Sequence, residues 1–374
     1  MNHRERVAQA IQHKETDRVA TGEWAIDKNL MGKIVNKSAK DFDKYYDTMK
    51  VYELLDLDLK GVDCTFESSP VKEYLGMSQA GRRIIKDGWG AVYEESEFGT
   101  LNAGLIESPI KKPSDIYSYR MPSLGIYERN AREIEKWIRD TDFFIGALVW
   151  GGRGMLTSLL GYENYMIWSL TNRAEIADLI QEFTRYNSEV AKMYIDAGVQ
   201  LILLEDDLAG NKGLLMSPDF YRNILFPALK KEILDIKAYA RLKGKEIPVF
   251  LHSDGNINLV IQDLIDIGVD GLHPLEPAAG MDIASIKAQY GNRITLMGNI
   301  DTRFILPMGN PQDVENEVKR VLDSAATGGG LILSSANMYT TDVPVENVYT
   351  VYKTVKNYRA SLSHEVLHSR SDHR

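Results

Sequence analysis

Histidine and carboxylate side chains follow short apolar runs in this chain, and together these residue types can bind a metal ion. His252 closes an apolar run that begins at Ile247, and Asp254 follows it two positions later. Glu205 and Asp206 follow a second apolar run in the same way. Neutral imidazole and carboxylate oxygens are ligands that suit Zn²⁺. We therefore predict that His252 and Glu205 hold a metal ion, with Asp206 or Asp254 near enough to complete its ligand shell.

Further polar and aromatic side chains occur where other apolar runs end. Carboxylates at such positions can transfer protons, and we predict catalytic roles for Glu276, Asp254 and Asp206. The predicted substrate-binding residues are Glu23, Trp24, Trp150, Asn299, Asn337 and Tyr339.

Each of these residues also has a simpler interpretation. His252 can be a hydrogen-bonded core histidine, and Glu276 can be an ordinary loop carboxylate. Asp207 can cap the turn that follows it, while His273, before Pro274, is interpreted as structural. Tryptophans pack in cores more often than they bind substrates. These alternatives stay open at this point.

The chain carries more acidic than basic residues. Its 374 residues include 44 Lys and Arg against 53 Asp and Glu, a formal net charge of −9. The basic residues do not cluster, so the chain is a poor candidate for nucleic-acid binding. Carboxylates gathered in a partly desolvated place must be protonated, paired or bound to a cation. The carboxylates at the ends of the apolar runs therefore favour a bound cation and disfavour a polyanionic substrate.

The composition also predicts where the protein resides. No apolar run approaches the length of a membrane-spanning helix, so no membrane span is expected. The charged N-terminus predicts no secretory signal, and the single cysteine, Cys64, cannot form an internal disulfide. A cytoplasmic protein is the simplest expectation.

Eight short apolar runs alternate with amphipathic segments at helical spacing, and these elements must position the candidate residues. Several runs are hydrophobic throughout, as expected for parallel strands buried on both faces. The alternation predicts a (β/α)8 barrel, or TIM barrel, in which catalytic groups lie at the carboxyl ends of the strands. The runner-up, a doubly wound open sheet, normally has a glycine-rich phosphate loop, and none occurs here. The predicted strands are Arg18–Ile26, Val62–Glu67, Phe143–Trp150, Val199–Asp206, Ile247–Asp254, Val269–Glu276, Ile294–Asp301 and Leu331–Asn337.

One segment, around residues 71–122, interrupts this alternation. Within it, Asp87-Gly88 is typical of the turn of a β-hairpin. We predict that the segment is an insertion that covers one face of the barrel. Residues 1–374 as a whole are expected to form a single barrel domain.

Five motifs occur in a fixed order along nearly the whole chain. They are Asn2–Val19, Ser217–Tyr221, Met297–Asp301, Gly328–Leu333 and Val343–Val348. In this order they resemble the motifs of the uroporphyrinogen decarboxylase superfamily. The resemblance implies a (β/α)8 barrel, often a homodimer, which agrees with the alternation of elements.

The superfamily contains two main chemistries, porphyrinogen decarboxylation and corrinoid-linked methyl transfer. The arginine-rich motif of the decarboxylase is missing, because the matching residues Ala20–Asp27 contain no arginine, and its glycine-histidine-glycine is replaced by Ser335–Asn337. Two segments, Asp87–Val92 and Leu275–Asp282, are instead similar to motifs of the methyltransferase branch. Coenzyme M methyltransferases of that branch bind zinc through a His-x-Cys pair and a later cysteine. Here His252–Asp254 stands at the pair without a cysteine, which implies nitrogen and oxygen ligands, better matched to an oxygen substrate.

The resemblance and the acidic run ends together lead to a hypothesis about function. We expect a methyltransferase of the O-demethylase type, which moves a methyl group from a small methoxylated substrate to a corrinoid protein. Breaking a methyl–oxygen bond requires a Lewis acid such as Zn²⁺ or a general acid, for which Glu276 is the candidate. The corrinoid is implied on a partner chain by resemblance only. The alternatives are a metal-free decarboxylase of a smaller carboxylated substrate, and an accessory subunit that has lost catalysis.

Overall fold

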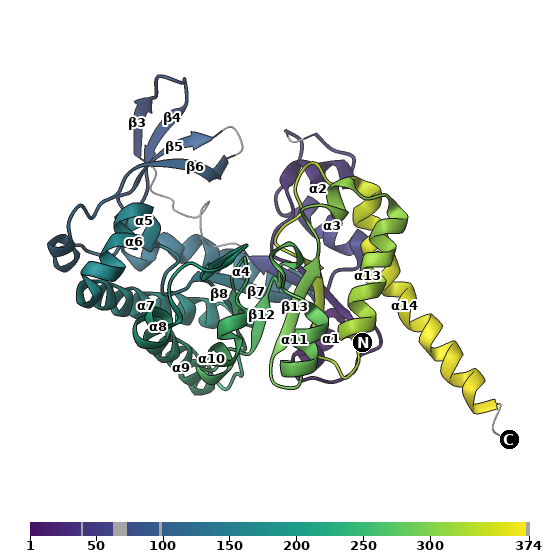
Figure 1. The fold of residues 1–374 in the computed structure, drawn as a ribbon. Coiled ribbons are helices and arrows are strands. Elements are labelled where there is room, and N and C mark those ends of the chain that lie inside the picture. The colour runs from purple at the N-terminus through teal and green to yellow at the C-terminus, as the bar shows by residue number, and fades with distance from the viewer. Residues whose placement is uncertain (39, 63–72, 97–98, 372–374) are drawn as a thin grey trace.

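Eight parallel strands close into a barrel in the computed structural model, which describes residues 1–38, 40–62, 73–96 and 99–371 (Figure 1). Around the barrel, hydrogen-bonded neighbours follow the order β1-β14-β13-β12-β11-β8-β7-β2. The predicted (β/α)8 barrel is therefore confirmed. The barrel strands are β1 Ala20–Glu23, β2 Leu59–Val62, β7 Phe144–Trp150, β8 Leu201–Glu205, β11 Val249–His252, β12 Gly271–His273, β13 Thr295–Ile300 and β14 Leu331–Ser335.

The second strand differs from its prediction. It begins at Leu59, three residues before the predicted Val62–Glu67, and pairs with β7 in the register Leu59↔Phe144. The charged Lys60 interrupts the apolar pattern of this strand, so the pattern did not predict a strand at Leu59. The structure accommodates this lysine because its ammonium group lies over the rings of Tyr52 and Trp137, 5.4 and 5.6 Å from their centroids. Residues 63–72 lie outside the described part of the chain, and Cys64 lies among them.

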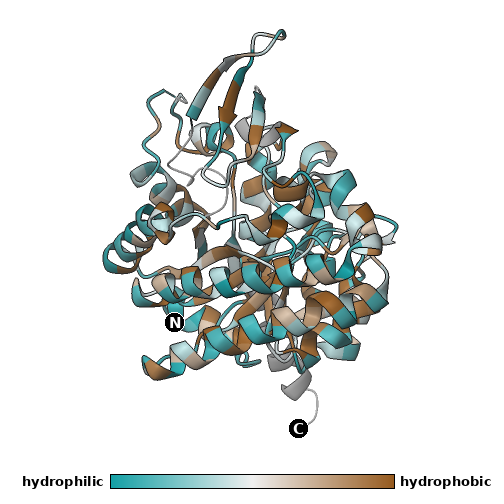
Figure 2. Ribbon diagram, turned by 90° about the vertical axis from the view of Figure 1, so that its left-hand side faces the viewer, coloured by the Kyte–Doolittle hydropathy of each residue, from teal (hydrophilic) through white to brown (hydrophobic). Residues whose placement is uncertain are grey.

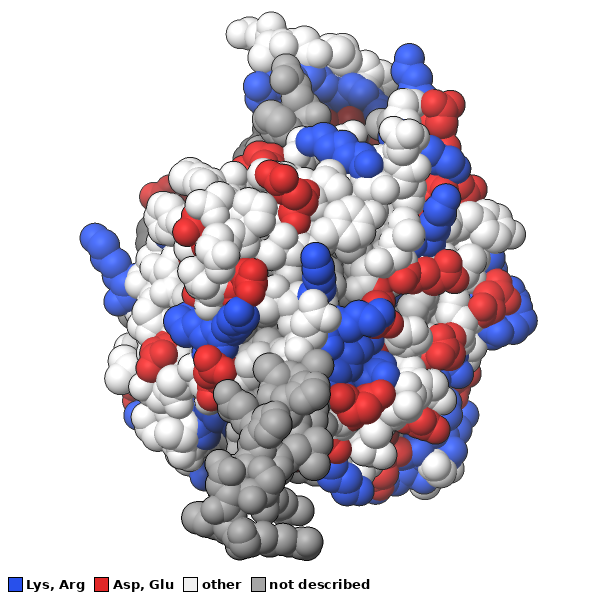
Figure 3. All heavy atoms as spheres, turned by 90° about the vertical axis from the view of Figure 1, so that its right-hand side faces the viewer, with Lys and Arg blue, Asp and Glu red and all other residues white. Residues whose placement is uncertain are grey.

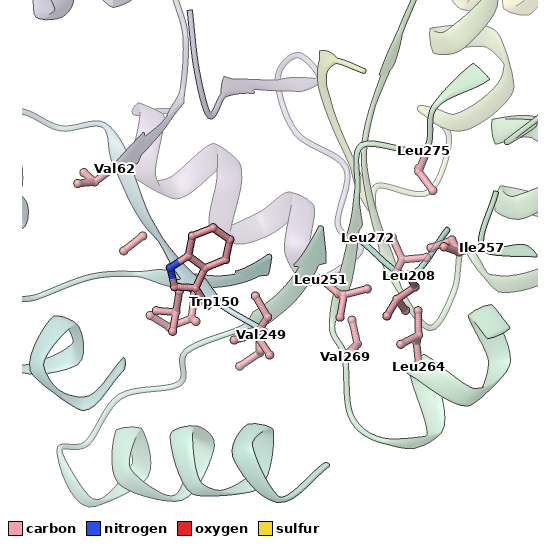
Figure 4. Close-up of a cluster of buried hydrophobic side chains, with 14 of the residues drawn as sticks. Val62, Trp150, Leu208, Val249, Leu251, Ile257, Leu264, Val269, Leu272 and Leu275 are labelled. Atoms are coloured by element: carbon pink, nitrogen blue, oxygen red, sulfur yellow. The ribbon is translucent and has the colours of Figure 1, made fainter. Parts of the chain in front are cut away.

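Alternate residues of each barrel strand pack on different sides of the barrel wall. In β8, Leu201 and Leu203 join the cluster that fills the barrel interior, whereas Ile202 and Leu204 join the larger cluster between the strands and the surrounding helices. Figure 4 shows part of the larger cluster, and Figure 2 shows hydrophilic and hydrophobic residues alternating along the helices around the strands. A strand that is hydrophobic throughout thus contributes side chains to both clusters, one inside the barrel and one between the strands and the helices.

The helices surround the barrel (Figure 1). The α-helices are α1 His3–Ile11, α2 Lys28–Ile34, α3 Tyr46–Leu55, α4 Glu128–Asp140, α5 Leu156–Leu160, α6 Tyr162–Thr171, α7 Arg173–Asp196, α8 Pro218–Phe220, α9 Phe226–Leu242, α10 Ile261–Asp266, α11 Ile283–Tyr290, α12 Ile305–Met308, α13 Pro311–Ala325 and α14 Val345–Ser371. Among the described residues, no helix combines the length and the apolar character needed to cross a membrane.

The predicted insertion forms a four-stranded antiparallel sheet that projects from the barrel (Figure 1), while its buried Trp89 packs against Phe183 and Tyr186 of α7. Asp87-Gly88 lies in the turn between β4 (Arg83–Lys86) and β5 (Val92–Ser96). The Asp87 carboxylate closes this turn by accepting hydrogen bonds from the backbone N–H groups of Trp89 and Ala91, both at 2.9 Å. The predicted hairpin is thus confirmed, but the sheet is larger than predicted, because one further strand pairs with each of the two hairpin strands. The strands are β3 Glu73–Met77, β4 Arg83–Lys86, β5 Val92–Ser96 and β6 Gly99–Glu107.

Charged side chains are distributed over the surface in mixed groups. On the face shown in Figure 3, Lys and Arg are interspersed with Asp and Glu and form no extended basic patch. This face offers no electrostatic footprint for a nucleic acid.

Candidate functional site

Three potential metal ligands meet at the carboxyl ends of β8 and β11. One oxygen or nitrogen atom from each of Asp207, His252 and Asp254 lies within 4.8 Å of the others. Nε2 of His252 is 3.7 Å from Oδ1 of Asp207 and 3.6 Å from Oδ1 of Asp254. Within the described residues, no other group of three or more such side chains comes this close together.

The backbone around these residues fixes where the carboxylates point. The backbone N–H of Asp254 donates to Oδ1 of Asp207 at 2.9 Å, and the Ser253 hydroxyl accepts from the N–H of Leu208 at 2.9 Å. Gly255 follows with φ +78°, and a Cβ there would lie 2.6 Å from the backbone of Ala209. Only glycine therefore lets the two loops approach closely enough to bring the carboxylates together.

A second histidine lies beside the first, on the neighbouring strand. Nδ1 of His252 lies 2.7 Å from Nδ1 of His273, which is adjacent on β12. His273 is 2% exposed, and burial, followed by the charge of His252, lowers its pKa well below the ordinary value. This shift favours the neutral form of His273, and a hydrogen bond between the two Nδ1 atoms requires a proton on one of them. If His252 carries this proton, its Nε2 has a lone pair directed at the two carboxylates, as a metal ligand requires.

Two further residues complete the rim of the site. The Asn337 amide, which follows β14, reaches across the barrel mouth and donates to Oδ2 of Asp254 at 2.6 Å. Glu276, after β12, accepts from the backbone N–H of Gly255 at 3.0 Å. Oδ1 of Asp254 is buried and has no hydrogen-bond partner among the described residues.

The acidic surroundings change the protonation of Asp254. Burial raises its pKa to about 6, and the charges of Asp207 and Glu276 act in the same direction, whereas His252 and the Asn337 hydrogen bond oppose the increase. Near neutral pH the carboxyl group is mostly ionised, and a cation would stabilise this form further. The carboxylate crowding predicted from the sequence is thus real at this position.

The predicted ligand Glu205 does not belong to this group. Glu205 is the Cα partner of His252 in the β8–β11 ladder, but the atoms that come within 4.8 Å of one another belong to Asp207 instead. The strand ends at Glu205, so the side-chain alternation also ends there, and the loop turns Asp207 toward His252. Neither Asp207 nor His273 was predicted as a site residue, although each lies within three residues of the end of an apolar run.

Asp206 faces away from this group and into the protein. It is fully buried, and its Oδ2 accepts from the backbone N–H of Arg153 at 3.2 Å. Burial raises its pKa to about 7, although the charge of Arg153 opposes the increase. The Arg153 guanidinium also donates to the carbonyl of Asp207. Asp206 therefore lies behind the strand ends and contacts the loop that follows β7.

Glu23 and Tyr339 lie on the outer side of β1 and β14, away from His252. Glu23 is fully buried, accepts from the backbone N–H and hydroxyl of Ser335 at 2.8 and 2.6 Å, and accepts from the Tyr352 hydroxyl of α14 at 2.8 Å. The Tyr339 ring packs against Tyr352 with centroids 6.4 Å apart. Burial raises the pKa of Glu23 to about 7. In this arrangement both residues fasten α14 to the barrel.

The two predicted tryptophans lie in different cores, and Asn299 supports a loop. Trp24 fills the barrel interior below His273, with ring centroids 6.3 Å apart, whereas Trp150 belongs to the outer cluster (Figure 4). Asn299 donates to the carbonyls of Leu275 and Met281 at 2.7 and 3.3 Å and so holds the loop that carries Glu276.

The donor set fits a divalent cation that prefers nitrogen and oxygen ligands. The ligands of a tetrahedral Zn²⁺ at about 2.0–2.2 Å are separated from one another by roughly 3.4 Å, close to the separations of His252 Nε2 from the two carboxylate oxygens. The unpartnered Oδ1 of Asp254 belongs to one of these pairs. Three protein ligands also leave a coordination position for a substrate, as catalytic zinc sites do.

The chain belongs to the uroporphyrinogen decarboxylase (URO-D) family. The family model matches residues 105–358, which include all of the residues that form the candidate site.

Individual relatives cover both chemistries that the sequence suggested. The methylcobamide:CoM methyltransferase MtaA of Methanosarcina barkeri is 27% identical over 210 residues, which are 55% of this chain and 56% of that protein. The uroporphyrinogen decarboxylase of Chlorobium limicola is 30% identical over 128 residues, 34% of this chain and 32% of that one. The chain thus spans about half or less of the length of the curated relatives it matches.

A solved structure confirms the fold over nearly the whole chain. A methyltransferase from Methanosarcina mazei superimposes with a TM-score of 0.74 at 19% identity, covering 96% of this chain and 99% of that one. The B12-independent methionine synthase of a Shewanella strain aligns more distantly, with a TM-score of 0.52 at 14% identity.

Proposed function

We propose that this protein is a methyltransferase that moves a methyl group from a small methoxylated substrate to a corrinoid held by a partner protein. The observation that carries the proposal is the group formed by Asp207, His252 and Asp254 at the barrel mouth of a member of this family. Similarity to a methylcobamide:CoM methyltransferase supports methyl transfer. The absence of thiolate ligands at the described site supports an oxygen substrate over a thiol.

In this proposal His252, Asp207 and Asp254 hold the cation, with Asn337 and His273 as the residues that orient them. A Zn²⁺ held by these residues would supply a Lewis acid for the oxygen that loses its methyl group. Glu276, which holds the adjacent loop through the N–H of Gly255, is the proposed general acid for that oxygen. The oxygen would keep the C–O electron pair and take up the proton from Glu276, and the partner protein's corrinoid would supply the acceptor for the methyl group.

The experiment combines metal analysis with a methyl-transfer assay. The purified protein is expected to contain close to one equivalent of metal, and His252→Ala is expected to lose both the metal and demethylation of methoxylated aromatic compounds in the presence of a corrinoid protein. A metal-free preparation with full activity would refute the role of the metal. Sedimentation of the same preparation tests the expected homodimer and the corrinoid-protein complex.

Decarboxylation is the second candidate, because several relatives are uroporphyrinogen decarboxylases. In that case a smaller carboxylated substrate would release CO₂ without a metal or a corrinoid partner. The two functions are separated by measuring CO₂ release and methyl transfer on the same enzyme, with His252→Ala as the common control. Retention of CO₂ release in this variant would favour decarboxylation.

A further inference from the structure

The loop that follows β7 packs directly on the segment that carries the candidate metal ligand Asp207. The backbone N–H of Gly151 donates to the carbonyl of Glu205 at 2.7 Å. A Cβ at Gly151 would lie 2.5 Å from Cβ of Asp206, and a Cβ at Gly154 would lie 2.8 Å from the carbonyl oxygen of Glu205. Glycines at these two positions therefore let the loop approach the backbone that follows β8.

Arg153, in the same loop, is a buried arginine whose guanidinium meets the backbone of Asp207. Arg153 is 6% exposed, and its guanidinium donates to the carbonyl of Asp207. Cζ of this group lies 5.5 Å from the centroid of the Tyr165 ring. Asp206, which accepts from the backbone N–H of Arg153 at 3.2 Å, compensates part of the buried positive charge. These contacts hold the guanidinium in one place.

The peptide group between Asp207 and Leu208 is held at both ends. Its carbonyl accepts from Arg153, and its N–H donates to the Ser253 hydroxyl at 2.9 Å. Because a peptide group is planar, these two hydrogen bonds fix its orientation and with it the backbone of Asp207. β8 ends at Glu205, so this peptide lies past the strand, where side chains hold it in place of a strand partner.

The orientation of this peptide bears on the candidate metal site through the Asp207 carboxylate. The side chain is 46% exposed, and its Oδ1 lies 3.7 Å from Nε2 of His252. The same oxygen accepts from the backbone N–H of Asp254 at 2.9 Å. Packing alone does not confine a side chain that is this exposed. The direction of the carboxylate therefore depends on that hydrogen bond and on the backbone that carries it.

We propose that Arg153 is a positioning residue for Asp207, which it orients through the backbone carbonyl without touching the metal or the substrate. This role rests on the proposed function in one respect, because it takes Asp207, His252 and Asp254 as the metal ligands. Partners that orient metal ligands typically contribute about 10- to 100-fold to metal affinity. Arg153 thereby connects the loop after β7 to a site that is built by the loops after β8 and β11.

The test compares Arg153→Met with Arg4→Met, a matched control at the opposite end of the barrel. The Arg4 guanidinium also donates to backbone carbonyls, namely those of Ile138, Thr141 and Phe143, which precede β7. Competition against a chromophoric chelator is expected to show zinc affinity about 10- to 100-fold weaker in Arg153→Met and unchanged in Arg4→Met. Full zinc affinity in Arg153→Met would overturn the proposal. Equal losses in the two variants would also overturn it, because they would reflect a general loss of structure.

Hydrogen exchange at the Asp254 amide gives a second readout that needs no metal. This N–H donates to Oδ1 of Asp207, so its exchange in the metal-free protein is expected to be at least about tenfold faster in Arg153→Met and unchanged in Arg4→Met. If the wild type binds no zinc, the metal role in the proposed function fails, and this measurement alone decides the role of Arg153. An unchanged exchange rate would then overturn the proposal.

A double variant keeps the test decisive if Arg153→Met does not fold. Loss of the arginine alone leaves the buried Asp206 without its cation, whereas Arg153→Met combined with Asp206→Asn removes both charges. Asparagine at position 206 keeps an acceptor for the N–H of residue 153. Relative to Asp206→Asn alone, the double variant is expected to show the same loss of zinc affinity and the same faster exchange. No difference between these two variants would overturn the proposal.

Discussion

The contact between His252 and His273 makes a prediction that separates metal binding from folding. The His273→Phe variant keeps an aromatic ring at a position that is 2% exposed, but removes the nitrogen that lies 2.7 Å from Nδ1 of His252. In the wild type this contact fixes which nitrogen of His252 carries the proton and which one faces the carboxylates. In the variant the imidazole ring of His252 loses this constraint.

The expected magnitude follows from the role of partners that orient metal ligands. Loss of such a partner typically lowers metal affinity 10- to 100-fold, or about 1.4–2.7 kcal/mol. The stability of the metal-free protein should respond much less. Nε2 of His273 is buried without a partner among the described residues, and an unsatisfied buried polar group costs about 1–3 kcal/mol. Phenylalanine removes this cost but also takes away the partner at 2.7 Å from Nδ1 of His252, so the two effects oppose each other and the metal-free variant should unfold at nearly the same temperature as the wild type.

The assay is competition for Zn²⁺ against a chromophoric chelator, together with thermal unfolding of the metal-free protein. His13→Asn is the matched control, because His13 has a positive φ of 55° that asparagine tolerates, and it lies outside the described ligand group. Unchanged zinc affinity in His273→Phe would refute the orienting role of His273. A large loss of stability in the metal-free variant would refute the argument from its unpartnered nitrogen.

Three further predictions concern protonation and backbone geometry. Asn337→Ala removes a hydrogen bond that lowers the pKa of Asp254, so this pKa should rise above about 6. The midpoint of zinc binding in a pH titration should then move upward by up to about one pH unit. An unchanged midpoint would contradict the role of the amide. Glu23 has a folded-state pKa of about 7 against an ordinary value of 4.5. Its folded state therefore binds a proton more tightly than the unfolded state, and the free energy of unfolding should fall by about 3 kcal/mol between pH 4.5 and 7, a slope that Glu23→Gln should remove in denaturant titrations. If the slope persists in the variant, Glu23 is not its source. Gly255→Ala should destabilise the protein by about 1–3 kcal/mol more than Gly81→Ala, because both residues have positive φ but only Gly255 has backbone atoms within 3 Å of a new Cβ. Equal losses in chemical denaturation would show that backbone strain alone is responsible.

The sequence was sufficient to predict the barrel and the region of the candidate site. Parallel strands buried on both faces produce continuous apolar runs, and this local property is visible without a structure. The strand that contains Lys60 was predicted too late in the chain, because a lysine does not fit an apolar run. This lysine is stabilised by the rings of residues 52 and 137, which lie on two helices, and such contacts are not visible in the local sequence. The prediction that His252 and Asp254 lie near each other at a strand end needed only their spacing and the end of an apolar run.

Tertiary structure decided which of the predicted residues meet. Glu23 and Trp24 are neighbours in the sequence, yet Trp24 fills the barrel interior while Glu23 accepts a hydrogen bond from α14. The alternation of side chains is local, but which face becomes the interior depends on how the sheet closes.

The contacts that shape the candidate site are long-range for the same reason. His252 meets His273 across 21 residues, and Asn337 meets Asp254 across 83. The chain thus specifies by itself a parallel barrel with an acidic, histidine-containing mouth. Only barrel closure brings loops from separate strands together, and it places Asp207, in place of the predicted Glu205, beside His252 and Asp254. The direction of a side chain beyond the end of a strand depends on the loop packed against it, and that packing is not encoded in local periodicity.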